Sequence, residues 1–306
     1  MHPLSMSNAI HSISVEGLTK RYGEVTAVED LSLNVRPGAV TGFLGPNGAG
    51  KTTALAAIVG IIRPTAGRVL IDGASVSAAP PDARKLGVHI ESSGAHPGRS
   101  ARDHLRSLAA LVGLPRRRVE EVLAIVGLER AAGRRVGKYS TGMRQRLGLA
   151  AALLGDPEIL VLDEPLNGLD PQGIRWLRTF LRDRAAGGGT VLLSSHVLTE
   201  AAQTVDDVIV IHQGRLVRQG SIAELEQLGA GGVFVSSPTR ERLAMAVQRA
   251  GGVVEFQNGD GLVVHGIDAA AVGELAHDER VLLRQLSSRG GSLEEVFFSL
   301  TEKEAA

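Results

Sequence analysis

Eight consecutive residues fill every position of the phosphate-binding pattern G-x-x-x-x-G-K-S/T: Gly45, Pro46, Asn47, Gly48, Ala49, Gly50, Lys51 and Thr52. The apolar run 39–44 before them predicts a buried strand, and residues 52–61 after them predict a helix, which is the context that such a loop requires. Backbone N–H groups would then surround a phosphate at the helix N-terminus. We expect Lys51 to reach the β- and γ-phosphates of a nucleotide and the Thr52 hydroxyl to ligate Mg²⁺. The alternative is a glycine-rich turn that matches by chance.

Composition limits the classes of protein to which this chain can belong. Its 306 residues are enough for about two domains. With 33 basic and 33 acidic residues the net charge is +0, so no broad attraction to nucleic acid is expected. The absence of cysteine excludes disulfides and thiolate metal sites. No stretch approaches the ~18 consecutive apolar residues of a membrane-spanning helix. We therefore expect no bilayer crossing, and any membrane role would require a partner.

Two kinds of pattern alternate before residue 222. Short β-rich runs at 13–18, 31–35, 39–44 and 68–71 are followed by helical patterns between 99 and 155. Apolar strands return at 159–162, 191–193 and 208–211, alternating with helices at 171–185 and 198–204. This order predicts a largely parallel α/β sheet with an inserted helical segment.

The remaining chain has a different pattern. Predicted strands at 233–236, 253–256, 262–265 and 281–286 enclose helices at 239–250 and 269–276. This β-α-β-β-α-β order is typical of a ferredoxin-like unit, although a less regular appendage is the alternative. A last helix is predicted from Ser292, which begins a capping box.

Two adjacent carboxylates, Asp163 and Glu164, end the apolar run 159–162. A strand in this position delivers side chains to the carboxyl edge of the sheet, where α/β proteins hold ligands. Asp163 suits a Mg²⁺ site because it offers hard oxygen ligands, and Glu164 suits a general base for an attacking water. The alternative is a simple turn at the strand end, since Pro165 follows.

Several further residues are candidate functional residues only because they accompany the phosphate loop and the carboxylate pair. Ser140 is placed to cap a helix, and the same helix start is also suited to bind a phosphate of a second nucleotide. Residues 167–170, Asn-Gly-Leu-Asp, follow the carboxylate pair, and His196 follows the apolar strand 190–193. A lone histidine at a strand end is more often structural than functional.

Together these motifs resemble the nucleotide-binding subunit of ATP-binding cassette (ABC) transporters, over residues 13 to about 221. The resemblance assigns Gly45 through Thr53 to the Walker A loop and Asp163 with Glu164 to the Walker B pair. It assigns residues 140–143 to the signature, 167–170 (ending at Asp170) to the D-loop and His196 to the switch histidine. Tyr22 lies where the family stacks an aromatic ring on adenine, and packing at a strand end is the less favoured alternative.

Two departures from the usual family pattern are informative. The signature reads Tyr-Ser-Thr-Gly-Met over 139–143, keeping Ser140 and Gly142 but lacking the glutamine, and Glu91 replaces the usual Q-loop glutamine. Both features resemble the bacitracin-resistance and lantibiotic-immunity ATPases, although the proline and aromatics that usually follow the glutamate are absent. A carboxylate near a γ-phosphate is repelled by it. Glu91 therefore fits only as a ligand on the metal or water side, or turned away from the nucleotide.

The resemblance implies a P-loop NTPase fold of the ABC ATPase type, with a mixed sheet, an antiparallel β subdomain and an α-helical subdomain at about 88–155. We expect a tail at 1–12, this domain at 13–221 and a small α+β, ferredoxin-like accessory domain at 222–306. Two copies would enclose two ATP molecules, with Glu164, His196 and Lys51 acting in hydrolysis and Mg²⁺ held by Thr52, Asp163 and Glu91. The nucleotide would contact Tyr22, the Walker A residues, Glu91, Ser140, Gly142 and Asp170.

The predicted function is the ATPase subunit of a drug or peptide-antibiotic exporter, docked on a separate membrane permease at the inner face of the cell membrane. In the family, the segment 91–111 receives the permease. Neither nucleic acid nor direct membrane contact is expected. The competing class is a non-transport ABC ATPase acting on DNA or ribosomes, and a nutrient importer is a further alternative. A permease encoded beside this gene would favour transport.

Overall fold

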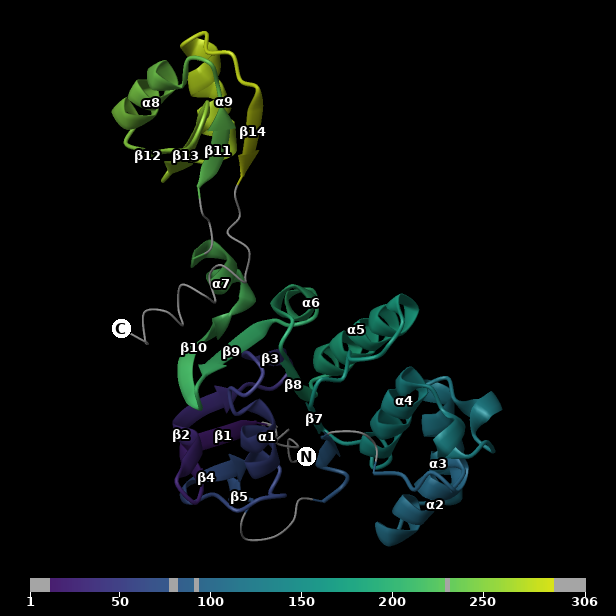
Figure 1. Cartoon of the computed structure of the whole chain (residues 1–306). Coiled ribbons are helices and arrows are strands. Elements are labelled where there is room, and N and C mark those ends of the chain that lie inside the picture. Colours follow the sequence, from purple (N-terminus) through teal and green to yellow (C-terminus); the bar gives the residue numbers. More distant parts are fainter. Residues whose placement is uncertain (1–11, 77–81, 91–93, 229–231, 289–306) are drawn as a thin grey trace, which may run out of the picture. The chain divides into compact units, whose positions relative to one another are not determined.

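The computed structural model describes residues 12–76, 82–90, 94–228 and 232–288 of the chain. The chain divides into two compact units, residues 1–222 and 223–306 (Figure 1), which are described separately below. Residues 91–93 and 289–306, which include Glu91 and the helix predicted from Ser292, lie outside the described residues.

A six-stranded sheet forms the centre of the first unit, in the order β10-β9-β3-β8-β7-β6. Neighbouring strands are parallel except for β10, which pairs antiparallel with β9. The strands are β3 (Val40–Leu44), β6 (Leu86–His89), β7 (Ile159–Leu162), β8 (Thr190–Ser195), β9 (Asp207–His212) and β10 (Arg215–Ser221). Every residue of β3, β7 and β8 is buried, as expected for parallel strands covered on both faces.

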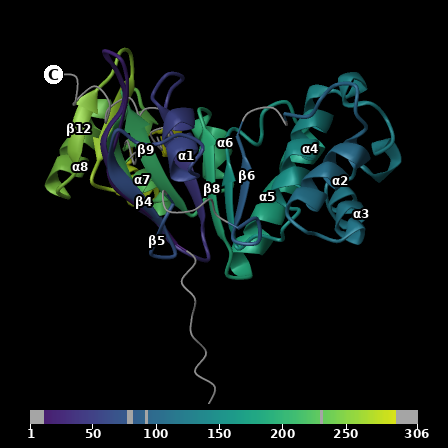
Figure 2. The same ribbon diagram turned by 90° about the horizontal axis from the view of Figure 1, so that it is seen from below.

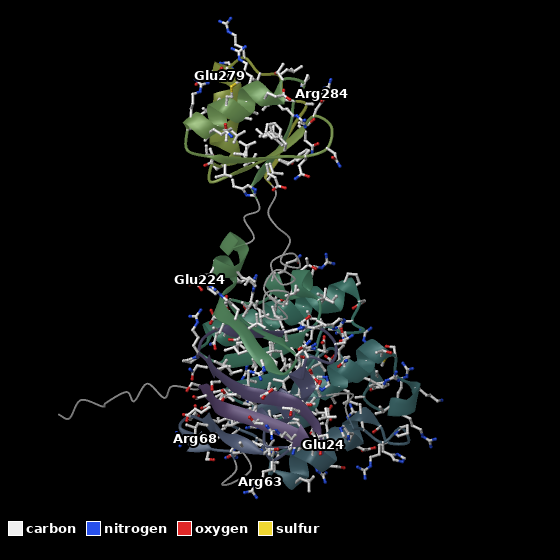
Figure 3. The ribbon with its side chains drawn as sticks, turned by 60° about the vertical axis from the view of Figure 1, so that its left-hand side comes forward. Glu24, Arg63, Arg68, Glu224, Glu279 and Arg284 are labelled. Carbon is white, nitrogen blue, oxygen red and sulfur yellow. The ribbon has the colours of Figure 1, made fainter. Side chains whose placement is uncertain are left out.

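A second, antiparallel sheet follows the order β2-β1-β4-β5. It consists of β1 (Ile13–Tyr22), β2 (Val25–Val35), β4 (Ala66–Ile71) and the short β5 (Ala74–Ser75). Alternate residues of β1 and β2 are buried near their paired ends, so one face of this sheet contributes to the core. Its exposed face carries polar side chains such as Arg68, which pairs with Glu16 at 2.6 Å (Figure 3).

Helix α1 (Lys51–Ile58) joins these two sheets into one core. Leu55 and Ile58 share a buried cluster with Leu31 of β2, Val161 of β7 and Ile209 of β9. The helix ends three residues before the predicted end at Ile61, because Gly60 adopts a positive φ of 80°, typical of the residue that terminates a helix. On the sheet itself, α5 (Pro171–Ala186) packs against β3 and β8, and α6 (Leu198–Ala202) packs against β3.

Three helices inserted between β6 and β7 form a separate lobe of this unit, seen in two orientations in Figures 1 and 2. They are α2 (Ala101–Leu111), α3 (Arg116–Ile125) and α4 (Thr141–Ala152), with 3₁₀ turns at Glu129–Ala131 and Val136–Lys138. All three helices contact one another, and α4 also packs against β6. The lobe is therefore joined to the parallel sheet through the helix that follows Ser140.

The second unit contains a four-stranded antiparallel sheet in the order β12-β13-β11-β14. Its elements are β11 (Val233–Ser236), α8 (Arg240–Arg249), β12 (Val253–Phe256), β13 (Gly261–His265), α9 (Ala269–Asp278) and β14 (Gln285–Ser288). The order of elements is the predicted β-α-β-β-α-β. Apolar residues of α8 and α9 form a core with β11 and β13. At the surface, Glu279 (labelled in Figure 3) pairs with both Arg242 (3.3 Å) and Arg249 (2.5 Å).

Some predicted elements differ from the structure. The last strand begins at Gln285 and not at Val281, because Val281 turns inward after α9 and is buried in the core. Strands β6 and β10 and helix α7 (Ile222–Leu228) have no counterpart among the predicted elements. Residues 215–221 of β10 are half-exposed and mostly polar, so an edge strand of this kind lacks a clear apolar pattern.

Candidate active site

The carboxyl ends of three neighbouring parallel strands bring the predicted motifs together. Leu162 of β7 pairs with Leu193 of β8, and Leu44 of β3 pairs with Ser195 of β8. The phosphate loop follows β3, Asp163 and Glu164 follow β7, and His196 follows β8. Residues far apart in the sequence therefore meet at one edge of the sheet, the usual position of ligand sites in α/β proteins.

The phosphate loop joins β3 to the start of α1. Gly50 has a φ of 95°, and a Cβ atom there would lie 2.4 Å from the Ala27 carbonyl oxygen, so only glycine fits. This close approach also places strand β2 beside the loop. Asn47 and Gly48 are exposed, Ala49 is buried, and Thr53 is half-buried on α1. The exposed loop tip leaves backbone N–H groups accessible to an anion.

Lys51 is buried, with 6% of its surface exposed, and lies across the loop. Its Nζ donates hydrogen bonds to the carbonyl oxygens of Gly45 at 2.7 Å and Pro46 at 3.2 Å, and lies 3.6 Å from Oε1 of Glu164. Burial lowers the pKa of Lys51, and the negative charges of Glu164 and Asp163 oppose that shift. The ammonium group thus lies between the loop and the carboxylate pair.

Asp163 accepts hydrogen bonds on both of its carboxylate oxygens. The Thr52 hydroxyl donates to Oδ2 at 2.8 Å, and the Ser194 hydroxyl donates to Oδ1. Thr52 is exposed while Asp163 is buried, and their hydrogen bond is partly buried. These hydroxyl and carboxylate oxygens are the ligand types that Mg²⁺ prefers.

Glu164 joins the cation of the loop to the histidine at the end of β8. Its Oε2 lies 2.9 Å from Nδ1 of His196, and its Oε1 faces Lys51. The Glu164 backbone has a φ of 48°, in the left-handed region that side-chain-bearing residues rarely occupy. Such strained backbone often occurs at functional sites. This arrangement aims the carboxylate into the site.

The signature and the D-loop contact each other at a different place in the chain. Ser140 caps α4 by accepting a hydrogen bond from the Met143 N–H at 3.2 Å. A Cβ at Gly142 would lie 2.8 Å from the Gly168 carbonyl oxygen, so these two glycines allow a close backbone approach. Asp170 caps α5 by accepting from the Gly173 N–H at 2.9 Å. Within the described ranges, no hydrogen bond or ion pair joins Ser140 or Gly142 to the phosphate loop.

Tyr22 lies at the turn between β1 and β2. Its side chain is 52% exposed, and the Lys20 ammonium lies 4.9 Å from the centre of its ring. The hairpin approaches the phosphate loop through Ala27, as described above. An exposed ring on this hairpin is available to stack on a base.

Three residues with contacts in or near the site were not found by the sequence analysis. Ser194 bonds both members of the carboxylate pair. Arg146 of α4 donates to the Val126 carbonyl oxygen, lies 3.9 Å from Asp170 and packs on the Trp176 ring. His89 contacts Gln145 at 2.6 Å, and burial lowers the pKa of its imidazole. The only signal for Ser194 was its position two residues before His196.

Comparisons with known proteins are consistent with this geometry. A family model described as ABC transporter matches residues 28–167. The bacitracin transport ATP-binding protein BcrA of Enterococcus faecalis is 35% identical over 294 residues, covering 94% of this chain and 96% of BcrA. The chain belongs to the ATP-binding subunits of ABC transporters. It is also 36% identical to the Nod factor export ATP-binding protein I of Paraburkholderia xenovorans, over 96% of this chain and 98% of that protein.

Solved ABC structures confirm the fold of this ABC ATPase. A dimeric bacterial ABC transporter cassette is 25% identical with a TM-score of 0.64, covering 69% of this chain and 98% of that one. The predicted mixed sheet, antiparallel sheet and inserted helices are therefore confirmed. Membership of the ABC transporter family confirms ATP as the nucleotide and ATP hydrolysis as the activity. Residues 231–294 match a model described only as a domain of unknown function. No helix among the described residues is long and apolar enough to span a membrane.

Proposed function

We propose that this protein is the ATP-hydrolysing subunit of an exporter for a drug or peptide antibiotic, acting as a homodimer on a separate membrane permease. The observation that carries the proposal is the convergence of Lys51, Asp163, Glu164 and His196 at one sheet edge. ATP hydrolysis needs a cation for the phosphates and a group that orients the attacking water, and this edge holds both.

Within one chain, each of these side chains has a separate role. Lys51 is placed to leave its carbonyl partners and bind the β- and γ-phosphates, because its ammonium group already lies across the loop. Glu164 accepts the proton of the attacking water, and His196 holds the Glu164 carboxylate in position through Nδ1. A neutral imidazole that donates at Nδ1 keeps Nε2 free to accept a further hydrogen bond.

The residues present suit a Mg²⁺ ion. Thr52 and Asp163 would hold it, because their oxygens already face each other beside the phosphate loop. When bound, Mg²⁺ would neutralise the charge that develops on the phosphate oxygens. Glu91 stays a predicted ligand of this ion and of the nucleotide, and it is also a residue that we expect to tune coupling to the permease.

The second face of each ATP would come from the partner copy. Ser140 and Gly142 stand at the N-terminus of α4, whose free N–H groups and dipole attract anions. Among the described residues no hydrogen bond or ion pair links them to their own phosphate loop, and we propose that they bind the nucleotide held by a second copy of the chain. The dimeric ABC cassette of similar fold supports this arrangement. Asp170 of the D-loop would also contact this nucleotide, because the D-loop and the signature lie against each other at Gly168 and Gly142.

The helical lobe carries a cationic surface suited to a protein partner. Between residues 96 and 155 the sequence has twelve Arg or Lys residues and four Asp or Glu residues. Four exposed cations cluster around the 3₁₀ turn before Ser140, without an ion pair in the described part of the chain: Arg99, Arg134, Arg135 and Lys138. Hydrogen bonds between Val136 N–H and Arg99 C=O, and between Gly137 N–H and Pro97 C=O, hold the two loops together.

We propose that this cluster contacts an acidic segment of the permease, so the subunit works peripherally at the inner face of the membrane. The cluster lies directly before the signature in the chain. A permease segment bound to it would therefore lie close to the residues that bind nucleotide. The names of BcrA, a bacitracin transport protein, and of the Nod factor export protein support a transport role but name different cargoes. The Tyr-Ser-Thr-Gly-Met signature favours the drug or peptide class.

Purification of the tagged protein from its native membranes tests this function directly. We expect an integral membrane permease to copurify and ATP hydrolysis to be stimulated by it. Copurification with ribosomes or DNA, and with no membrane protein, would instead support a non-transport ABC ATPase.

A further inference from the structure

Ser194 is the penultimate residue of β8, and its side chain is fully buried at 0% exposure. The parallel pairing of Leu162 with Leu193 places it beside the end of β7. Its hydroxyl oxygen lies 2.8 Å from the Glu164 backbone nitrogen and also contacts Oδ1 of Asp163. One hydroxyl group therefore touches both members of the carboxylate pair.

The chemistry of these groups fixes the direction of both hydrogen bonds. A backbone N–H only donates, so the Ser194 oxygen accepts from Glu164. The single hydroxyl proton then points to Asp163, which accepts at Oδ1 while Thr52 donates to Oδ2. A carboxylate that accepts a hydrogen bond on each oxygen is held in one orientation, and its oxygens are of the type that ligates a cation. Ser194 thus fixes the rotation of the Asp163 carboxylate.

The same hydroxyl also holds the backbone of Glu164. A φ of 48° is unfavourable for a residue with a Cβ and persists only where the surroundings enforce it. The bond from the Glu164 N–H to Ser194 is a constraint of this kind, and it acts on the residue whose carboxylate meets His196 at 2.9 Å. Loss of the hydroxyl would release the peptide of Glu164 and loosen that carboxylate.

We infer that Ser194 is a positioning residue for hydrolysis, setting the Asp163 carboxylate for the metal and the Glu164 carboxylate for the water. This inference rests on the proposed roles of those two residues. Because Ser194 acts through its contacts with Glu164 and Asp163, it should affect turnover and metal dependence more than ATP binding itself.

The test compares Ser194→Ala with Thr41→Val in the full-length protein. Thr41 is equally buried on the neighbouring strand β3, and its hydroxyl has no hydrogen-bond partner among the described residues, so it is a matched control. For Ser194→Ala we expect kcat to fall about tenfold or more, since its hydrogen bond to a charged group is lost, with a smaller rise in KM for Mg²⁺-bound ATP. The control should keep wild-type kinetics.

A binding measurement separates positioning from general damage. By isothermal titration calorimetry, the ratio of ATP affinity in Mg²⁺ to affinity in EDTA should fall in Ser194→Ala and stay unchanged in Thr41→Val. Ser194→Cys, which keeps similar volume and a weak donor, should be intermediate, and it replaces Ser194→Ala if the alanine variant does not fold. Unchanged kcat and an unchanged ratio in the Ser194 variants would overturn the inference. Absence of Mg²⁺-dependent hydrolysis in the wild type would contradict the proposed function itself.

Discussion

The imidazole of His196 and the carboxylate of Glu164 meet at 2.9 Å, Nδ1 to Oε2, although they follow different strands of the sheet. The other oxygen of Glu164 faces Lys51 at 3.6 Å. One carboxylate is thus held between a histidine and the cation of the phosphate loop. This relationship gives Glu164 a defined orientation and makes His196 part of the candidate site.

Replacement of His196 by alanine tests that relationship. We expect kcat to fall about a hundredfold, within the range for loss of a group that supports general-base catalysis, while ATP binding persists through Lys51. Steady-state ATPase assays and nucleotide titration measure the two quantities. His277→Ala is the control, because that histidine is exposed on α9 of the second unit. Equal kcat values for the two variants would remove His196 from the site.

His104 of α2 offers a test of stability against pH. It is 8% exposed, and its Nε2 has no hydrogen-bond partner among the described residues. Burial, and secondarily the charge of Arg99, lower the pKa of His104. The folded protein therefore disfavours the protonated form, and stability present above the unfolded pKa of about 6.5 is lost as pH falls toward the lower folded value.

The His104→Leu variant should remove this loss. We expect it to be more stable than the wild type by about 1 kcal/mol, because an unpaired buried polar group is replaced by an apolar one. The gain should be larger at pH 5.5 than at pH 7.5. Thermal unfolding at both pH values measures it. A variant that is less stable at both would show that His104 has a partner or a packing role that the leucine cannot replace.

The second unit should be dispensable for nucleotide binding. The contacts of Lys51, Asp163, Glu164 and His196 all lie within the unit that ends at Ile222. We expect a chain truncated after Ile222 to bind ATP with an affinity similar to that of the full chain, measured by calorimetry. The same truncation with Lys51→Ala is the control for binding at the phosphate loop. Well-folded truncated protein that no longer binds ATP would contradict the independence of the first unit.

Charge reversal of the cationic cluster tests the docking surface. Arg134→Glu combined with Arg135→Glu should greatly weaken copurification of the permease, while the ATPase rate of the isolated subunit changes less than about twofold, as is usual for exposed substitutions away from the chemistry. The matched control is Arg116→Glu with Arg117→Glu, a pair equally exposed at the start of α3. If both double variants retain the permease, the cluster does not form the docking surface.

The sequence predicted those parts of the site that are local in the chain. The phosphate loop, the carboxylate pair and the Ser140 cap each depend on consecutive residues, and the strand and helix on either side of the loop were predicted, apart from the end of α1. Ser194 was missed because its role requires β7 and β8 to be neighbours, which a single sequence does not specify. Arg146 was missed for the same reason, since its partners on α5 are distant in sequence.

Strand β6 was missed for a related reason. β6 is four residues long and contains Gly87 and His89, so its apolar signal is weak. Its structure is specified by pairing with β7 and by the contact of His89 with Gln145 of α4. Gly148 permits this contact, because a Cβ there would lie 2.2 Å from the His89 ring. Tertiary packing, and not local propensity, decided this strand.

The most direct test of the central claim is ATP turnover and binding by Glu164→Gln. The amide keeps the size of the side chain but does not accept the proton of the water, so we predict a fall in kcat of at least about a hundredfold. ATP affinity should be retained, and ATP-bound dimers should accumulate on gel filtration with ATP and Mg²⁺. Turnover near the wild-type rate, with no stable dimer, would contradict the assignment of Glu164 as the base.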